Sequence, residues 1–234
     1  LADWNLQQLA DAADQHLFKA LELAEASRTE LSTIPAIVTG DKERFVERPT
    51  LYDLLAREAF NMLGSPLLSV GDPEVPKPEQ YLGSAASFVQ LPLDMGSSTG
   101  TYRKLKILQS LTNFHLGPPS PALLDVNVMR LQYIRQLGIS DSAYATAFSR
   151  MYETFSATPG GDYLLVLEAQ VYANGSVENL GEKPKATALQ ILDKIQDKSP
   201  FVANQAESLR RRIMAKTLQT QVQTVYGKTD NILI

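Results

Sequence analysis

Signals for the start and end of helices recur along most of the chain, and they constrain its fold more than any other feature. Apolar residues return every three or four positions in one segment after another, which is the spacing of one face of an α-helix. Serine, threonine or proline opens several of these segments, and glycine or proline follows their ends. The pattern predicts helices over residues 3–31, 35–48, 51–63, 102–116, 121–137, 141–157, 162–173, 184–197 and 200–215.

The segment "PTLYDLLAREAFNMLGSP", residues 49–66, carries these signals most completely. Thr50 and Asp53 have the spacing of a capping box, in which the hydroxyl accepts from a first-turn amide and the carboxylate reaches back. Losing such a cap typically costs about 1 kcal/mol. Gly64 suits the position after the last turn, and Pro66 prevents the helix from continuing.

Two adjacent charges lie in the middle of that helix, at Arg57 and Glu58. On a helical wheel Arg57 lies nearly opposite the apolar stripe, so we expect it to face water, because an unpaired buried charge is costly. Glu58 lies at the edge of the stripe, where we expect it to pair with a neighbouring helix rather than to catalyse a reaction. The stripe itself is formed by Leu51, Leu55, Ala59 and Met62.

The composition is that of a soluble globular protein, and it excludes several classes of site. The 234 residues are 44% hydrophobic, enough for a sizeable core, and the net charge of −4 gives no basic field for nucleic acid or anionic membranes. The absence of cysteine excludes disulfides, thiolate nucleophiles and cysteine-bound zinc. No apolar run approaches the roughly 18 residues of a membrane span. Because the sequence opens on Leu1 and helix-like residues, we expect a piece of a longer chain whose targeting signal was removed.

Two segments differ in texture from the helices. Residues 64–100 are rich in proline and glycine and are expected to form a long irregular connection. In residues 217–234 apolar and β-branched residues alternate with glutamine, which is the period of a strand. A lone strand docks on the helices, pairs with another copy or begins a β-domain. We favour the last, and therefore expect a helical domain over 1–216 and a β tail over 217–234.

A weak internal repeat suggests paired helices. Ala147, Met151 and Pro159 return 41 residues later as Ala188, Leu192 and Pro200. Within the second unit, Ala169 and Tyr172 fall on the first helix, and Ala188, Leu192, Ile195 and Pro200 follow on the second, which is the order found in tetratricopeptide-type hairpins. The connection between the two helices of the second unit is too long for the standard repeat, and small residues before a proline also occur in ordinary bundles. The fold class predicted is all-α, with antiparallel helical hairpins in a tetratricopeptide-like array or bundle and a C-terminal β-strand or hairpin tail.

The search for chemistry yields no catalytic, cofactor-binding or metal-binding residue. His16 and His115 lie far apart, and neither has a histidine partner at the spacing of a helical zinc site. Asp72 and Glu74 lack the oxygen-rich spacing of a calcium loop. The arginine run at 209–214 closes a helix, where cations complement exposed carbonyls, so it is weak evidence for nucleic acid. Two carboxylates that are distant in the sequence but adjacent in the fold could still form a hydrolytic pair, so this alternative stays open.

Several stretches resemble the N-terminal helical region of alpha-2-macroglobulin-like proteins of Gram-negative bacteria. They are "ERPTLYDLLAREAFNML", "LLDVNVMRLQYIRQLGI", "YLLVLEAQVY", "ALQILDKI" and "RRRIMAKTLQTQVQTVYGKTDNILI". The resemblance runs from about residue 44 to the end and is poorest between 64 and 100. In that family the helical region precedes a train of β-sandwich macroglobulin domains. The resemblance thus implies that residues 217–234 begin such a domain.

The same resemblance implies a function in the cell envelope. Members are secreted or lipid-anchored proteins thought to trap or inhibit proteases, and the reactive thioester of some members lies far downstream. We therefore expect a non-catalytic scaffold or protein–protein interaction domain, periplasmic or anchored to the outer membrane. Its partner would be another protein or downstream domains of the same chain. Nucleic acid is not expected, and a membrane would be met only through an anchor outside this sequence.

A second hypothesis is a helical solute- or glycan-binding outer-membrane lipoprotein of tetratricopeptide-like type. Such proteins use exposed aromatic rings to stack on sugars, and this chain has a single tryptophan, Trp4. An enzyme is the third and least favoured reading.

Overall fold

The part of the chain that the computed structural model describes is all-helical. It comprises residues 6–34, 46–63, 77–93, 100–175, 180–197 and 199–215, and no strand occurs within these ranges. The α-helices are α1 (Leu6–Ser27), α2 (Leu51–Met62), α3 (Ala85–Gln90), α4 (Gly100–Phe114), α5 (Pro121–Arg135), α6 (Asp141–Phe155), α7 (Tyr163–Asn174), α9 (Pro184–Leu192) and α10 (Pro200–Met214). Two 3₁₀ helices, η1 (Leu31–Thr33) and η3 (Pro78–Leu82), complete the list.

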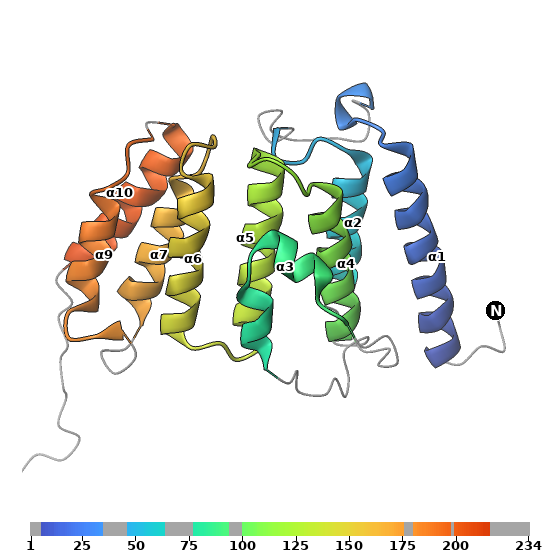
Figure 1. Cartoon of the computed structure of the whole chain (residues 1–234), viewed down its shortest axis with the longest axis horizontal. Helices are drawn as coiled ribbons and strands as arrows, with labels where there is room; N and C mark the ends of the chain where they lie inside the picture. Colours follow the sequence, from blue (N-terminus) through green and yellow to red (C-terminus); the bar gives the residue numbers. More distant parts are fainter. Residues whose placement is uncertain are drawn as a thin grey trace, which may run out of the picture.

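The helices stand side by side in a row that follows the order of the chain (Figure 1). α1 closes one end and packs on α2, which packs on α4; α4, α5, α6 and α7 follow, and α9 and α10 close the other end against α7. η3 and α3 cross the row and cover α4 and α5. The all-α expectation is confirmed. A tetratricopeptide-like arrangement stays a prediction, and the β tail over 217–234 lies outside the described residues.

Local sequence signals explain where most helices begin and end. The capping box of α2 is present, with Thr50 and Asp53 each bonded to the backbone of the other. The Ser120 hydroxyl accepts from the first turn of α5, whose first residue is Pro121, as predicted. Gly138, at φ +94°, then adopts a left-handed conformation that favours glycine and turns the chain toward α6.

Some boundaries differ from the sequence-based expectation. α1 ends at Ser27 rather than at residue 31, because Arg28 adopts a positive φ of 49°. α9 ends at Leu192 rather than at 197, because the backbone amides of residues 196 and 197 bond to a side chain of another segment, described below. Most of the helix predicted over 35–48 lies outside the described residues.

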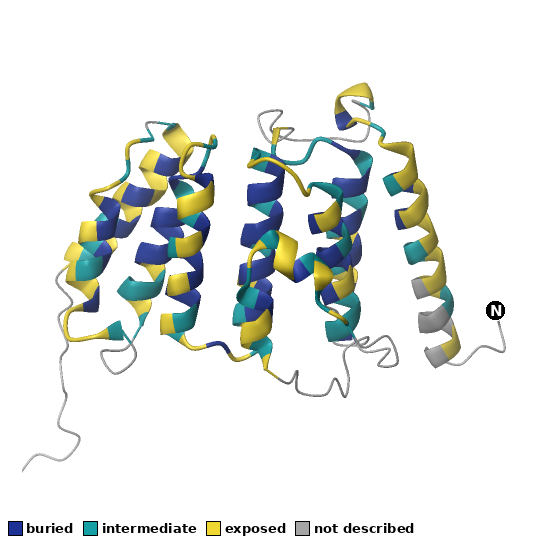
Figure 2. Cartoon of the chain, viewed as in Figure 1, coloured by how far each residue is buried: buried dark blue, intermediate teal, exposed yellow. Residues whose placement is uncertain are grey.

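The buried residues lie between neighbouring helices and form three hydrophobic clusters (Figure 2). One lies between α1, α2, α4 and α5, the largest lies between η3 and α3 to α7, and the third lies between α7, α9 and α10. Ala169 and Ala188 are fully buried in the third cluster, where their small size lets α7 and α9 approach closely.

The buried face of α2 overlaps only in part with the predicted stripe. The face that packs against α1 and α4 is centred on Tyr52, Ala56 and Ala59, while Met62 is 53% exposed. Leu51 and Leu55 are only half-buried. Ala59 of the predicted stripe is buried as expected, and Leu51 and Leu55 pack at the edge of the cluster. The wheel was wrong for Met62, and it missed Tyr52 and Ala56, because it gave most weight to leucine and methionine.

The stretch 64–100 was predicted to be irregular, and this is wrong for its described part. η3 and α3 both lie within it, and Tyr81 and Phe88 anchor them in the largest cluster, with ring centroids 6.3 Å apart. The Ser84 hydroxyl caps α3 by accepting from the amide of Ser87. The burial of two aromatic rings therefore stabilises helical structure here, although the composition is rich in proline.

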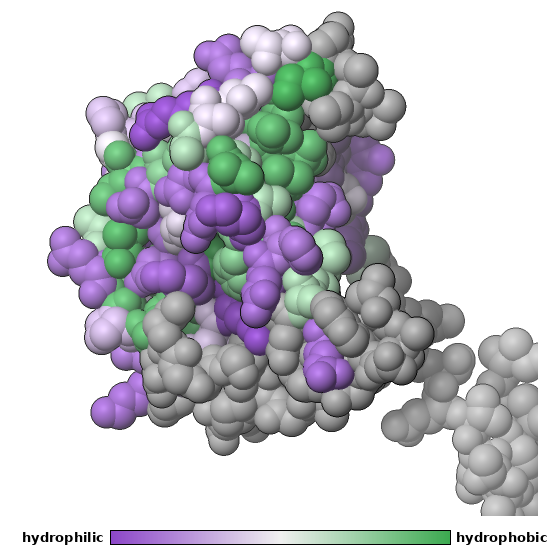
Figure 3. All heavy atoms as spheres, turned by 90° about the vertical axis from the view of Figure 1, so that its right-hand side faces the viewer, coloured by the Kyte–Doolittle hydropathy of each residue, from purple (hydrophilic) through white to green (hydrophobic). Residues whose placement is uncertain are grey.

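α1 leaves one end of the row facing solvent. Figure 3 views this end and shows hydrophobic side chains gathered in the upper part of the face, with hydrophilic ones around them. On α1, Leu23 is 62% exposed. Among the described residues no helix has both the length and the apolar composition needed to span a bilayer.

Candidate functional site

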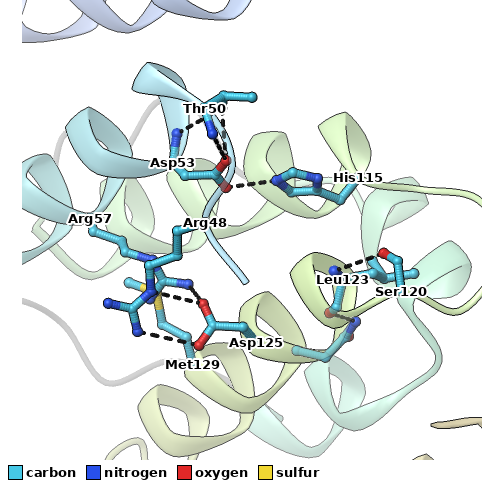
Figure 4. A network of polar contacts seen from close by, with 10 residues as sticks. Arg48, Thr50, Asp53, Arg57, His115, Ser120, Leu123, Asp125 and Met129 are labelled. Carbon is cyan, nitrogen blue, oxygen red and sulfur yellow. Dashed lines mark hydrogen bonds and ion pairs between the residues drawn. The ribbon is translucent and has the colours of Figure 1, made fainter. Parts of the chain in front are cut away.

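Arg57 does not face water, contrary to the prediction, but joins α2 to α5. Its guanidinium forms an ion pair with Asp125 and donates to the sulfur of Met129 at 3.1 Å (Figure 4). The Arg57 side chain is only 13% exposed. The prediction failed because the side of α2 opposite its leucines also packs, against Asp125 and Met129 of α5. Glu58, beside it, is exposed.

Asp125 accepts from a second arginine as well. Nε of Arg48 lies 3.1 Å from one carboxylate oxygen and its Nη2 lies 3.3 Å from the other. Burial lowers the pKa of Arg57, and Asp125 offsets this only in part. For Arg48, burial also acts to lower the pKa, but the hydrogen bond and charge of Asp125, together with the charges of Glu47 and Asp53, outweigh it and raise the pKa. One carboxylate thus holds two cations at the junction of α2 and α5.

A second cluster lies where α2 begins and α4 ends. Asp53 is fully buried, and its carboxylate accepts from the amide of Thr50 at 3.0 Å and from the hydroxyl of Thr50 at 2.7 Å. Its other oxygen lies 2.6 Å from Nε2 of His115 (Figure 4). Burial alone would raise the pKa of Asp53, but the hydrogen bonds and charge of His115 and Thr50 outweigh it and lower the pKa.

The order of groups in this cluster suits a structural contact between helices rather than nucleophilic catalysis. A catalytic relay places the base between the nucleophile and the acid that orients it. Here the carboxylate of Asp53 lies between the Thr50 hydroxyl and the His115 imidazole. The cluster caps α2 and joins it to the C-terminal end of α4. The Thr50–Asp53 half of this cluster was predicted as a capping box, but the contact with His115 was not, because Asp53 and His115 are 62 positions apart.

Arg130 is a buried cation bound by neutral groups. It is 2% exposed, and its guanidinium donates to the carbonyl oxygens of Tyr81 at 3.4 Å and Gly83 at 2.9 Å. The guanidinium also lies 4.7 Å from the centroid of the Phe88 ring. Burial lowers the pKa of Arg130 to about 10. This side chain fastens η3 and α3 onto α5.

Two buried carboxylates organise the other end of the row. Asp162 accepts from the backbone amides of Gln196 and Asp197, each at 2.7 Å, and from the hydroxyl of Tyr152 at 3.1 Å. It therefore fixes the connection between α9 and α10 against the start of α7. Glu168 accepts from the Ser149 hydroxyl at 2.6 Å, which links α7 to α6, and burial raises its pKa.

A surface pocket of about 390 Å³ opens between α5, α6 and α7. It lies near the end of α5, the beginning of α6 and the end of α7, at the lower side of the row in Figure 1. Within it Arg135 forms an ion pair with Asp141, and its guanidinium lies 5.6 Å from the Tyr144 ring centroid. Sequence reasoning missed this pocket, because its lining comes from three separate helices. The lining residues are Gln132, Arg135, Asp141, Tyr144, Phe148, Leu167, Gln170, Val171, Asn174 and Gly175.

The other residues singled out from the sequence lie elsewhere. His16 is exposed on α1. In the arginine run, Arg210 pairs with Asp193 at 2.6 Å and Arg211 with Glu207 at 2.9 Å. Asp72 and Glu74 lie outside the described residues, and within the described ranges no three histidine, aspartate or glutamate side chains are grouped so as to hold a metal ion.

Comparison with known proteins places the chain in no family. No protein-family model, curated protein sequence or solved structure matches it significantly.

Proposed function

We propose that this chain is a non-catalytic scaffold and protein-interaction domain at the N-terminus of an envelope alpha-2-macroglobulin-like, protease-trapping protein. The observation that carries the proposal is the use of charged side chains between helices. Arg57 with Asp125 joins α2 to α5, and Asp53 with His115 joins α2 to α4. These charged groups bind helices to one another and so stabilise the fold. We therefore expect the domain to act through its surface, by binding other proteins, rather than through a catalytic site. The envelope context rests on the sequence resemblance.

The envelope context is tested with a longer chain that continues beyond Ile234. Far-ultraviolet circular dichroism of that chain is expected to show the helical signal of this region plus a β-sheet signal from the added residues. An added segment that is purely helical would contradict the assignment.

The interaction role is tested by binding in trans. The purified chain is expected to bind the separately expressed downstream domains in isothermal titration calorimetry, and to leave the activity of a soluble protease unchanged. Absence of binding would refute docking onto downstream domains. Hydrolysis of a substrate by the purified chain, lost on changing Asp53 or Asp125 to asparagine, would refute the non-catalytic role.

The glycan-binding alternative has one observation in its favour, the pocket between α5, α6 and α7. The tyrosine of the 64–100 stretch, Tyr81, is only 3% exposed and packs against Phe88, so it offers no surface ring for stacking. Calorimetry against an oligosaccharide panel separates the two hypotheses.

A further inference from the structure

The sequence contains a single Asn–Gly pair, Asn174–Gly175, and it lies where α7 ends. Asn174 is the last residue of the helix and is exposed, and its side chain forms no hydrogen bond with another described residue. Gly175 leaves the helix in an extended conformation, at φ −79° and ψ 164°. Both residues line the pocket between α5, α6 and α7.

An asparagine that precedes a glycine converts to an acid without an enzyme. The backbone nitrogen of the glycine attacks the side-chain carbon Cγ of the asparagine, and a C–N bond forms. Nδ2 leaves as ammonia, with the proton that the glycine nitrogen loses. Water then opens the resulting cyclic imide at either carbonyl, so that a carboxamide and water become a carboxylate, of aspartate or isoaspartate, and ammonium. Glycine hinders the attack least, because it has no Cβ.

The structure favours glycine at position 175. A Cβ there would overlap the end of the Leu180 side chain and lie 3.0 Å from the carbonyl oxygen of Val171. Any other residue would therefore displace its neighbours. The reactive pair is thus a consequence of how tightly the chain turns away from α7.

The end of α7 holds the attacking nitrogen in a hydrogen bond. The amide of Gly175 donates to the carbonyl oxygen of Val171 at 2.9 Å. This bond must open, and Asn174 must leave its helical conformation, before the nitrogen reaches Cγ. Helix ends fray and open at a small cost in free energy. The reaction therefore proceeds in the folded chain, but more slowly than in an open peptide.

Conversion of Asn174 changes the charge of the pocket. The charged residues of its lining are Arg135 and Asp141, and they pair with each other. A carboxylate at position 174 adds a negative charge to this balanced lining. The new charge lies at the C-terminal end of α7, where the helix dipole disfavours it.

We propose that Asn174 is a site of spontaneous modification, which converts to aspartate and isoaspartate through the Gly175 nitrogen when the last turn of α7 opens. The conversion makes the lining of the pocket acidic as the protein ages. This inference is independent of the proposed scaffold function, because it needs no partner.

The test incubates the whole chain at mildly alkaline pH and follows each asparagine by peptide mapping and mass spectrometry. Asn174 is expected to convert first, with isoaspartate among the products, because only the imide route yields isoaspartate. Asn204 is the internal control, since it is exposed but lies inside α10 and precedes a glutamine. A capped peptide with the sequence of residues 171–175 is expected to convert about two- to tenfold faster than the folded chain, the factor for opening one backbone hydrogen bond.

Two variants separate the reaction from its effect. Asn174→Gln is expected to abolish conversion at this position, because the longer side chain cyclises far more slowly. Asn174→Asp imitates the product, and its melting temperature is expected to fall by about 1–4 °C at low salt and by less at high salt. The matched control is Asn204→Asp in the second turn of α10, which is expected to leave the melting temperature unchanged.

The proposal is overturned if Asn174 stays intact while the capped peptide converts completely, or if Asn204 converts first. Conversion to aspartate without isoaspartate would overturn the role of the Gly175 nitrogen. A folded chain that reacts as fast as the peptide would overturn the protection by the hydrogen bond to Val171. An unchanged melting temperature of Asn174→Asp at low salt would overturn the effect of the new charge.

Discussion

Replacing Asp125 by asparagine tests whether charged groups between helices hold this scaffold together. The variant keeps the shape of the side chain but removes the carboxylate that pairs with both Arg48 and Arg57. Breaking a fully buried pair costs about 3–5 kcal/mol. The side chains here are 13% (Arg57), 18% (Asp125) and 33% (Arg48) exposed, so we expect a smaller loss of about 2–3 kcal/mol.

The loss is measured by urea unfolding at pH 7 with an unchanged denaturant slope, and by a fall in melting temperature of about 4–12 °C. Asp193→Asn is the matched control, because Asp193 pairs with Arg210 but is 64% exposed, and it is expected to cost less than about 1 kcal/mol. A double-mutant cycle of Asp125→Asn with Arg57→Met is expected to show coupling of at least about 1 kcal/mol. Equal effects of Asp125→Asn and Asp193→Asn, or no coupling, would refute the reasoning.

Three further substitutions probe the other buried groups. Because the folded state lowers the pKa of Asp53 below its ordinary 3.8, the stability it contributes is present above that value and lost as pH falls through the folded pKa. Asp53→Asn should therefore flatten the acid limb of a stability–pH curve, and an unchanged limb would count against the Asp53–His115 bond. Burial raises the pKa of Glu168 above 4.5, so its charged form destabilises the fold as pH rises through the folded pKa. Glu168→Gln should then gain stability at pH 7 and be neutral near pH 4 in urea titrations; equal gains at both pH values would contradict this. Arg130→Met removes the donors to Tyr81 and Gly83, so hydrogen exchange should quicken in residues 77–93 while α5 stays protected; uniform quickening would contradict a local role.

Local signals in the sequence were sufficient to locate most helices. Ser120 with Pro121 marks the start of α5, and Gly138 marks its end, because caps, fixed proline geometry and left-handed glycine act within a few residues. α3 was not predicted, because it is only six residues long and lies among prolines. Its position depends on the burial of Phe88 in a cluster formed by helices distant in the sequence.

The candidate sites depend on contacts that no local pattern contains. Arg57 and Asp125 are 68 positions apart, and which side of α2 meets α5 is decided by the close fit of Ala56 and Ala59 against other helices. The pocket likewise needs α5, α6 and α7 to be assembled before its lining residues meet. Gln170 and Asn174 already share a helix face in the sequence, but nothing there indicates a cavity beside them.

The most direct test of the scaffold is native-state hydrogen exchange across α2, α4 and α5. If the polar contacts of Asp53 and Asp125 bind these helices into one unit, their slowest amides exchange through a common opening and lose protection together in the Asp125→Asn variant. Loss of protection confined to α2, with α4 and α5 unchanged, would contradict the account.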